Sequence, residues 1–137
     1  MYTRLFNEFI TTSETLQIYH DGSLLFSSEK DRLLPLLDYL EQTKGTYRQI
    51  AVLDRVTGNA AALLSILAGA TEIYSRMGSR IAVKTLGNYS VKCYFDEVVP
   101  YIQRKDGNGM CPMEELSLGK KPGEFYQALL DKINREA

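Results

Sequence analysis

The segment from Arg48 to Gly69 constrains the fold more than any other part of this sequence. It opens with the run 50–53, which is apolar and rich in strand formers, as is typical of a strand buried on both faces. It closes with the run 60–68, which consists of good helix formers without a breaker. Only a short polar stretch separates the two runs. The sequence therefore predicts a buried strand that turns at once into a helix, as in open α/β sheets.

Polar side chains make this turn the candidate functional edge of the molecule. Asp54 and Arg55 follow the strand, and Thr57, Gly58 and Asn59 precede the helix. Ligands of open α/β sheets bind where strands end, and the first N–H groups of a helix attract anions. We expect the Arg55 guanidinium to lie beside the free N–H groups of Gly58 and Asn59. The alternative is that Arg55 forms a structural ion pair with Asp54. The spacing matches neither a P-loop nor a Gly-x-Gly-x-x-Gly motif.

The rest of the chain alternates helix and strand signals, which predicts an α/β fold with a mixed five-stranded sheet between helices. Asp21-Gly22 between two apolar runs predicts a β-hairpin. We expect one domain over residues 1–137, with 1–13 as an N-terminal helix and 122–137 as a C-terminal helix. The other expected elements are a helix opened by the cap residues 27–31, a strand over 72–75, a helix capped by Ser79, a strand over 90–95 and a short helix from Asp96 to Ile102.

A second motif follows a glycine-framed loop near the C-terminus. Cys111 precedes a proline at the start of a predicted helix, where the helix dipole favours a thiolate. Cys111 is therefore a candidate nucleophile, and the alternative is that it fills a small hole in the core. Asp54 is the other catalytic candidate, as an acid at the strand end. Ser79 and Arg104 complete the candidate ligand-binding residues, together with the residues of the strand–helix turn.

Composition excludes several classes of function. Sixteen basic residues against seventeen acidic ones leave no basic excess, so we expect no nucleic-acid partner. Two cysteines and one histidine, without a Cys-x-x-Cys pair, fall short of a structural zinc site, and we expect no metal and no cofactor. No run approaches the roughly 18 apolar residues of a membrane span, and the N-terminus lacks a signal-peptide core. These features predict a soluble, cytoplasmic protein without a membrane partner.

Two motifs together resemble a known family. Asp-Arg-Val-Thr-Gly-Asn-Ala-Ala-Ala-Leu-Leu (54–64) and Arg-Lys-Asp-Gly-Asn-Gly-Met-Cys-Pro-Met-Glu (104–114), with Ser79 opening a helix, are similar to the prokaryotic family called domain of unknown function 1893. The resemblance covers roughly residues 15–118. It implies a cytidine-deaminase-like, three-layer α-β-α fold. This chain differs from the family pattern at Arg55 and Asn59, where lysine is usual, and at Gln103, where asparagine is usual.

The resemblance does not imply deaminase chemistry. A zinc deaminase would carry His-x-Glu or Cys-x-Glu at the start of one helix and Pro-Cys-x-x-Cys at the start of the next. Here the corresponding stretches are Glu29–Arg32 and Asp54–Gly58, which retain no ligand set, so zinc-dependent base deamination is excluded.

Three hypotheses for the function remain open. The leading one is a binding module for a small anionic or nucleotide-like ligand. The second is a metal-independent enzyme that uses Cys111, or Asp54 with Arg55, in the same crevice. The third is a structural domain that forms a homo-oligomer.

Overall fold

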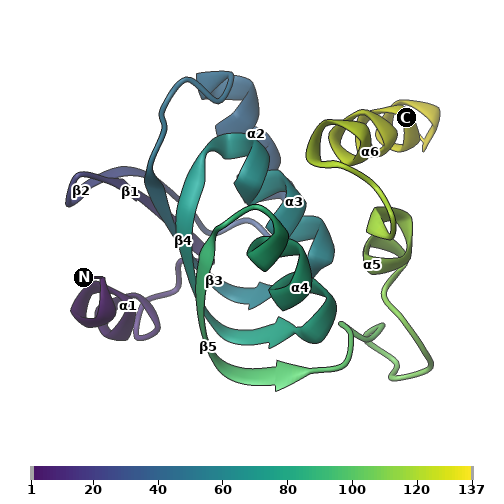
Figure 1. Cartoon of the computed structure of the whole chain (residues 1–137), viewed down its shortest axis with the longest axis horizontal. Helices are drawn as coiled ribbons and strands as arrows, with labels where there is room; N and C mark the ends of the chain where they lie inside the picture. The colour runs from purple at the N-terminus through teal and green to yellow at the C-terminus, as the bar shows by residue number, and fades with distance from the viewer. Residues whose placement is uncertain (1, 137) are drawn as a thin grey trace.

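The structure is a computed structural model that describes residues 2–136 (Figure 1). Helices and strands alternate along most of the chain, as the sequence predicts. In order, the elements are α1 (Thr3–Phe9), β1 (Leu16–His20), β2 (Ser23–Ser28), α2 (Leu34–Thr43), β3 (Ile50–Thr57), α3 (Asn59–Ala68), β4 (Ala70–Ser79), α4 (Arg80–Asn88), β5 (Lys92–Val99), α5 (Pro112–Ser117) and α6 (Pro122–Glu136).

The sheet is mixed and open, with the strand order β2-β1-β3-β4-β5. β1 pairs antiparallel with both β2 and β3, whereas β3, β4 and β5 are parallel to one another. Asp21 and Gly22 both have positive φ angles, 49° and 81°, which is the geometry that a tight hairpin turn requires. The predicted α/β class, the five-stranded mixed sheet and the Asp-Gly hairpin are confirmed.

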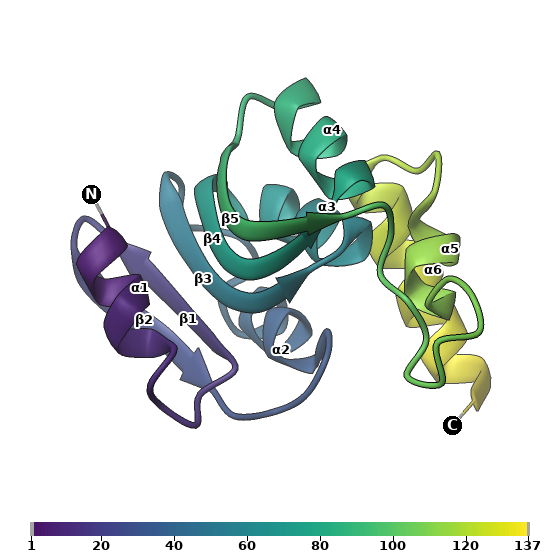
Figure 2. The ribbon, with the colours of Figure 1, turned by 90° about the horizontal axis from the view of Figure 1, so that it is seen from below.

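Helices cover the two faces of the sheet unequally (Figures 1 and 2). On one face, the buried apolar side chains of α2, α3 and α4 pack with those of β1, β3 and β4 in the larger core. α6 completes this core through Phe125 and Leu129. On the other face, α1 packs Phe6 and Phe9 against Tyr74 and a few neighbours in a smaller cluster. None of the helices within residues 2–136 is long and apolar enough to cross a membrane.

Several expected element boundaries are wrong. The N-terminal helix spans Thr3–Phe9 and not 1–13, and the strands expected over 72–75 and 90–95 span Ala70–Ser79 and Lys92–Val99. β3 does not end at Leu53 but continues to Thr57, because pairing with β4 through Thr57 and Gly78 extends the ladder over polar residues. α2 begins only at Leu34, with Pro35 in its first turn, and of the residues 27–31 expected to cap it, Ser27 and Ser28 belong to β2. Asp96 does not cap a helix, because it lies inside β5 and forms an ion pair with Arg76 of β4 at 3.2 Å.

Candidate functional site

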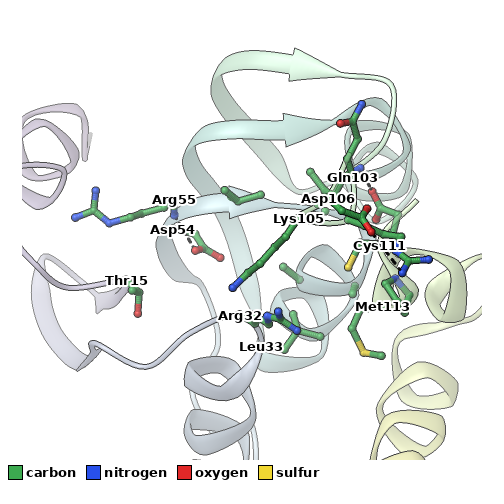
Figure 3. A pocket seen from close by; sticks show the side chains of 18 residues that line it. Thr15, Arg32, Leu33, Asp54, Arg55, Gln103, Lys105, Asp106, Cys111 and Met113 are labelled. Carbon is green, nitrogen blue, oxygen red and sulfur yellow. Dashed lines mark hydrogen bonds and ion pairs between the residues drawn. The ribbon is translucent and has the colours of Figure 1, made fainter. Parts of the chain in front are cut away.

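A cleft of about 710 Å³ lies at the carboxyl end of β3. Its walls come from the segment before β1, the segment before α2, the end of β3, the start of α3, the loop that leads from β5 into α5, and α5 itself. Figure 3 shows the side chains that line it. Residues from the two motifs found in the sequence meet here: Asp54, Arg55 and Gly58 from the first, and Arg104 and Cys111 from the second. Residues of the 104–111 loop therefore line the cleft at the end of this strand.

The sheet topology explains why an opening forms at this place. β3 has an antiparallel neighbour, β1, on one side and a parallel neighbour, β4, on the other. After β3 the chain continues as α3, which leads to β4. On the β1 side, the segments that contain Thr15 and Arg32 line the cleft instead. Ligands of open α/β sheets bind in crevices outside the carboxyl ends of strands, where the chain connections of neighbouring strands lead apart.

Asp54 points into this cleft (Figure 3). Its carboxylate accepts a hydrogen bond from the backbone N–H of Arg55 at 2.7 Å. Burial raises the pKa of Asp54 to about 7, although the N–H groups of Arg55 and Val56 and the Arg55 charge oppose this rise. The Asp54 carboxyl can therefore act either as a hydrogen-bond donor or as an acceptor near neutral pH.

Arg55 does not take the orientation expected from the sequence. Its guanidinium points away from the cleft toward α1, as Figure 3 shows. Nε donates to the carbonyl of Glu14 at 2.9 Å, and Nη2 donates to the carbonyl of Thr12 at 2.6 Å. Longer bonds at 3.4 Å reach the carbonyls of Ile10 and Phe9. Arg55 therefore binds backbone carbonyls at and just after the end of α1, and its guanidinium forms no ion pair with the side chain of Asp54.

A carboxylate of the chain itself occupies the expected anion position at the start of α3. Glu114 of α5 is 2% exposed, and its side chain accepts from the backbone N–H of Asn59. The other carboxylate oxygen accepts from the N–H of Ile102 at 2.8 Å. Gly58 makes room for this contact, since a Cβ there would lie 2.7 Å from the Ile102 side chain and 2.9 Å from the carboxylate. Glu114 thus joins α3, α5 and the loop before α5.

The remaining candidate ligand-binding side chains, Thr57, Asn59 and Ser79, are buried, and the last two hold helices in place. Asn59 donates to the carbonyl and hydroxyl of Ser117 at 3.3 and 3.0 Å and accepts from Thr85. Ser79 caps α4, as predicted, by accepting from the N–H of Ala82 at 3.0 Å. The hydroxyl of Thr57 is buried and has no hydrogen-bond partner within residues 2–136. None of these three side chains lines the cleft.

The second motif contributes a wall whose loop is bonded internally. Arg104 donates its backbone N–H to the carbonyl of Gly109 at 2.9 Å, and Gln103 and Met110 form a β-bridge. The Arg104 guanidinium lies 3.7 Å from the Asp106 carboxylate, with both side chains about half exposed. Cys111 is partly buried and borders the cleft beside α5.

Three features of the cleft were not found by sequence reasoning. Arg32 and Lys105 are exposed cations in its wall, and Figure 3 shows the Lys105 side chain extending across it toward Arg32. Arg32 has a φ of 59°, which is uncommon for a residue with a Cβ. Glu114 is the third feature, and the sequence signal for it was the carboxylate in the Cys-Pro-Met-Glu motif. Within residues 2–136, no group of three His, Cys, Asp or Glu side chains is arranged to hold a metal ion.

The comparisons with known proteins give one consistent result. A family model described as TM1506: Domain of unknown function (DUF1893) matches residues 4–133. The crystal structure of a DUF1893 family protein (TM1506) from Thermotoga maritima is similar to this chain at 26% sequence identity and a TM-score of 0.81. That similarity covers 94% of this chain and 87% of the Thermotoga chain. No curated protein matches the sequence. The chain therefore belongs to the DUF1893 family, whose model matches nearly its whole length.

Proposed function

We propose that the cleft at the end of β3 binds a small anionic, nucleotide-like ligand. The observation that carries this proposal is the combination of an apolar floor, a partly buried carboxyl at one side and exposed cations around the rim. A volume of about 710 Å³ lies within the range of small-molecule sites, roughly 300–1,000 Å³.

The floor suits a flat, weakly polar ring. Ala60 and Ala61 of α3 present small side chains, and Leu33, Ile102 and Met113 add larger aliphatic ones. None of the side chains from residues 2–136 that line the cleft is aromatic. A ring would therefore lie between aliphatic surfaces and gain affinity through burial of apolar area rather than through stacking on an aromatic side chain.

The cationic side chains of the cleft would bind the anionic group of the ligand. Arg32, Arg104 and Lys105 approach the cleft from two walls, the segment before α2 and the loop before α5. A phosphate between these walls would accept charge-assisted hydrogen bonds from both of them. Because Glu114 already occupies the N-terminus of α3, the phosphate belongs at the rim and not at the helix N-terminus. This location differs from the one expected from the sequence.

Asp54 would form hydrogen bonds with the polar edge of the ring. A carboxyl whose pKa is about 7 accepts hydrogen bonds from ring N–H or amino groups when ionised and donates one when protonated. Asp54 lies on the same face of β3 as Val56, which also lines the cleft, so the strand holds the carboxyl in a fixed position.

We also propose that the fold belongs to the cytidine-deaminase-like group. The order hairpin, helix, strand, helix, strand, helix, strand agrees with that assignment. In such a fold the two helix starts that carry zinc ligands in deaminases correspond to the segments before α2 and α3. Arg32 and Gly58 from these segments line the cleft. The proposed ligand would then bind where a deaminase holds its substrate, without zinc chemistry.

Calorimetric titration with cytidine 5′-monophosphate, cytidine and inorganic phosphate tests the proposal. We expect the monophosphate to bind more tightly than either fragment, because only it reaches both the floor and the rim. Arg32→Ala and Lys105→Ala should each weaken its binding by roughly ten-fold, the value of one charge-assisted hydrogen bond. Lys84→Ala, an exposed lysine on α4, is the matched control and should leave affinity unchanged. Equal affinities for all variants, or no binding of the monophosphate, would overturn the proposal.

A second candidate function is an enzyme in the same cleft. The observation that favours it is that Cys111 and the Asp54 carboxyl border one cavity, so a nucleophile and a proton acceptor share a substrate site. Arg55 is not part of this candidate active site, because its guanidinium is bound to backbone carbonyls beside α1. Phosphorus NMR of cytidine 5′-monophosphate incubated with the protein tests it. Turnover that disappears in both Cys111→Ser and Asp54→Asn supports an enzyme, and an unchanged spectrum rejects hydrolysis of this probe.

A further inference from the structure

β5 is the edge strand on the side of the sheet remote from the hairpin (Figure 1). Within residues 2–136 it pairs with β4 along one side and with no strand along the other. It runs over eight residues without a proline, and Pro100 follows it. Such a strand presents a row of backbone N–H and C=O groups on which another strand can pair.

The side chains of β5 on the face that carries α1 form a rigid, partly apolar strip. Tyr94 is 47% exposed and stacks on Tyr74 of β4, with ring centroids 4.6 Å apart and an angle of 19° between the planes. Tyr74 in turn contacts Tyr2 and Phe6 of the α1 cluster. Val98, further along β5, is 46% exposed. Tyr94 is therefore held in place by the core and still open to a partner.

We propose that a second copy of this chain pairs with β5, antiparallel and about a two-fold axis, to form a ten-stranded sheet across a homodimer. This proposal is independent of the ligand proposed for the cleft. Its argument is charge complementarity, because the order of side chains along β5 favours one register of self-pairing.

Symmetry leaves few registers to choose from. In a continuous sheet the two-fold axis is perpendicular to the sheet, so one residue of β5 must lie opposite its own copy. An axis at Tyr94 places Lys92 opposite the partner's Asp96 and Asp96 opposite the partner's Lys92, with the two Tyr94 rings between these pairs. All of these side chains point to the same face, since their positions differ by two. Direct cross-strand pairs of opposite charge stabilise antiparallel sheets.

The neighbouring registers lack this match. An axis at Asp96 or at Glu97 would place two like charges directly opposite each other, which destabilises pairing. An axis at Phe95 would place Tyr94 opposite Asp96 and Lys92 opposite Val98, so neither charge would face its opposite. Asp96 is also ready to accept a second cation, because its ion pair with Arg76 leaves it 60% exposed.

The opposite edge of the sheet is less suited to a second copy. β2 is shorter, and its pairing with β1 is irregular at Ile18 and Tyr19. Its sequence, Ser-Leu-Leu-Phe-Ser-Ser, carries no charges that could select a register.

Complementary charge variants of the full chain test the proposal by light scattering after size exclusion. The wild type should have the mass of two chains. Lys92→Asp faces the partner's Asp96 with a like charge, and Asp96→Lys faces the partner's Lys92 in the same way, so each variant alone should be a monomer. An equal mixture of the two should form dimers again, because each heterodimer contains two pairs of opposite charge. Lys84→Asp on α4 changes the net charge equally and should remain a dimer.

The result that overturns the proposal is a monomeric wild type, or variants that stay dimeric alone, or a mixture that stays monomeric. A crosslinking variant covers the case in which a charge variant fails to fold. With Cys93 and Cys111 replaced by serine, Tyr94→Cys should form a disulfide-linked dimer on oxidation, because residues facing their own copy lie within disulfide range. Val98→Cys in the same background should not. Equal crosslinking at both positions, or none at Tyr94→Cys, rejects this register.

Discussion

Glu114 provides the sharpest test of how the cleft is built. Glu114→Gln keeps the shape of the side chain and removes one of its two acceptor oxygens. Because the carboxylate accepts from the N–H groups of both Asn59 and Ile102, the amide must turn an N–H toward one of these donors. The variant therefore loses one charge-assisted bond and weakens the other in a site that is 2% exposed. We expect a loss of about 2–4 kcal/mol in the free energy of unfolding.

Urea unfolding followed by circular dichroism measures this loss, and thermal melting should show a decrease in Tm of roughly 10 °C. Glu115→Gln, the exposed neighbour on α5, is the matched control and should change stability by less than about 0.5 kcal/mol. If Glu114→Gln is as stable as the wild type, then Glu114 does not join α3 to the loop before α5, and the N-terminus of α3 is open to an external anion after all.

Three further predictions concern residues of the two motifs. Arg55→Ala should lower stability by about 2–4 kcal/mol through loss of its bonds to the end of α1, and leave the calorimetric affinity for cytidine 5′-monophosphate unchanged; weaker binding at unchanged stability would contradict this. Since folding raises the pKa of Asp54 to about 7, its contribution to stability is complete below pH 4 and falls as pH rises to 7. Asp54→Asn should therefore lose less stability than the wild type between these pH values in urea titrations, and parallel curves would refute the shift. Ser79→Ala should cost about 1 kcal/mol as a lost cap of α4, measured by the same unfolding.

Local signals allowed much of the fold to be predicted. The Asp21-Gly22 turn and the Ser79 cap depend on a few adjacent residues, and both form as expected. The ends of β3 and β5 depend instead on neighbouring strands. Asp96 has the side chain of a helix cap, but pairing with β4 and the ion pair with Arg76 hold it in a strand. Sequence reasoning could not anticipate that, since the strand partners were not known.

The location of the candidate site was predictable from the sequence, but the orientation and contacts of its side chains were not. The two motifs were expected to meet at the end of β3, and Asp54 and Cys111 do border one cleft. The orientation of Arg55 was not predictable, because its acceptors are carbonyls more than forty positions earlier in the chain. Glu114 was missed for the same reason, since the N–H group of Asn59 that it binds is 55 positions away. Contacts of this length follow from the packing of α1 and α5, which no local pattern encodes.

The most direct test of the proposed function is an NMR titration of the isotope-labelled protein with cytidine 5′-monophosphate. We expect saturable shifts of the backbone amide resonances around the cleft, in the segments 32–33, 58–61 and 102–105. The amide resonances near Gly22 and Glu72, which border a separate hollow beside α1, should not shift and serve as an internal reference. Saturable shifts confined to that hollow, or no saturable shift at any amide, would contradict the claim that this cleft is the binding site.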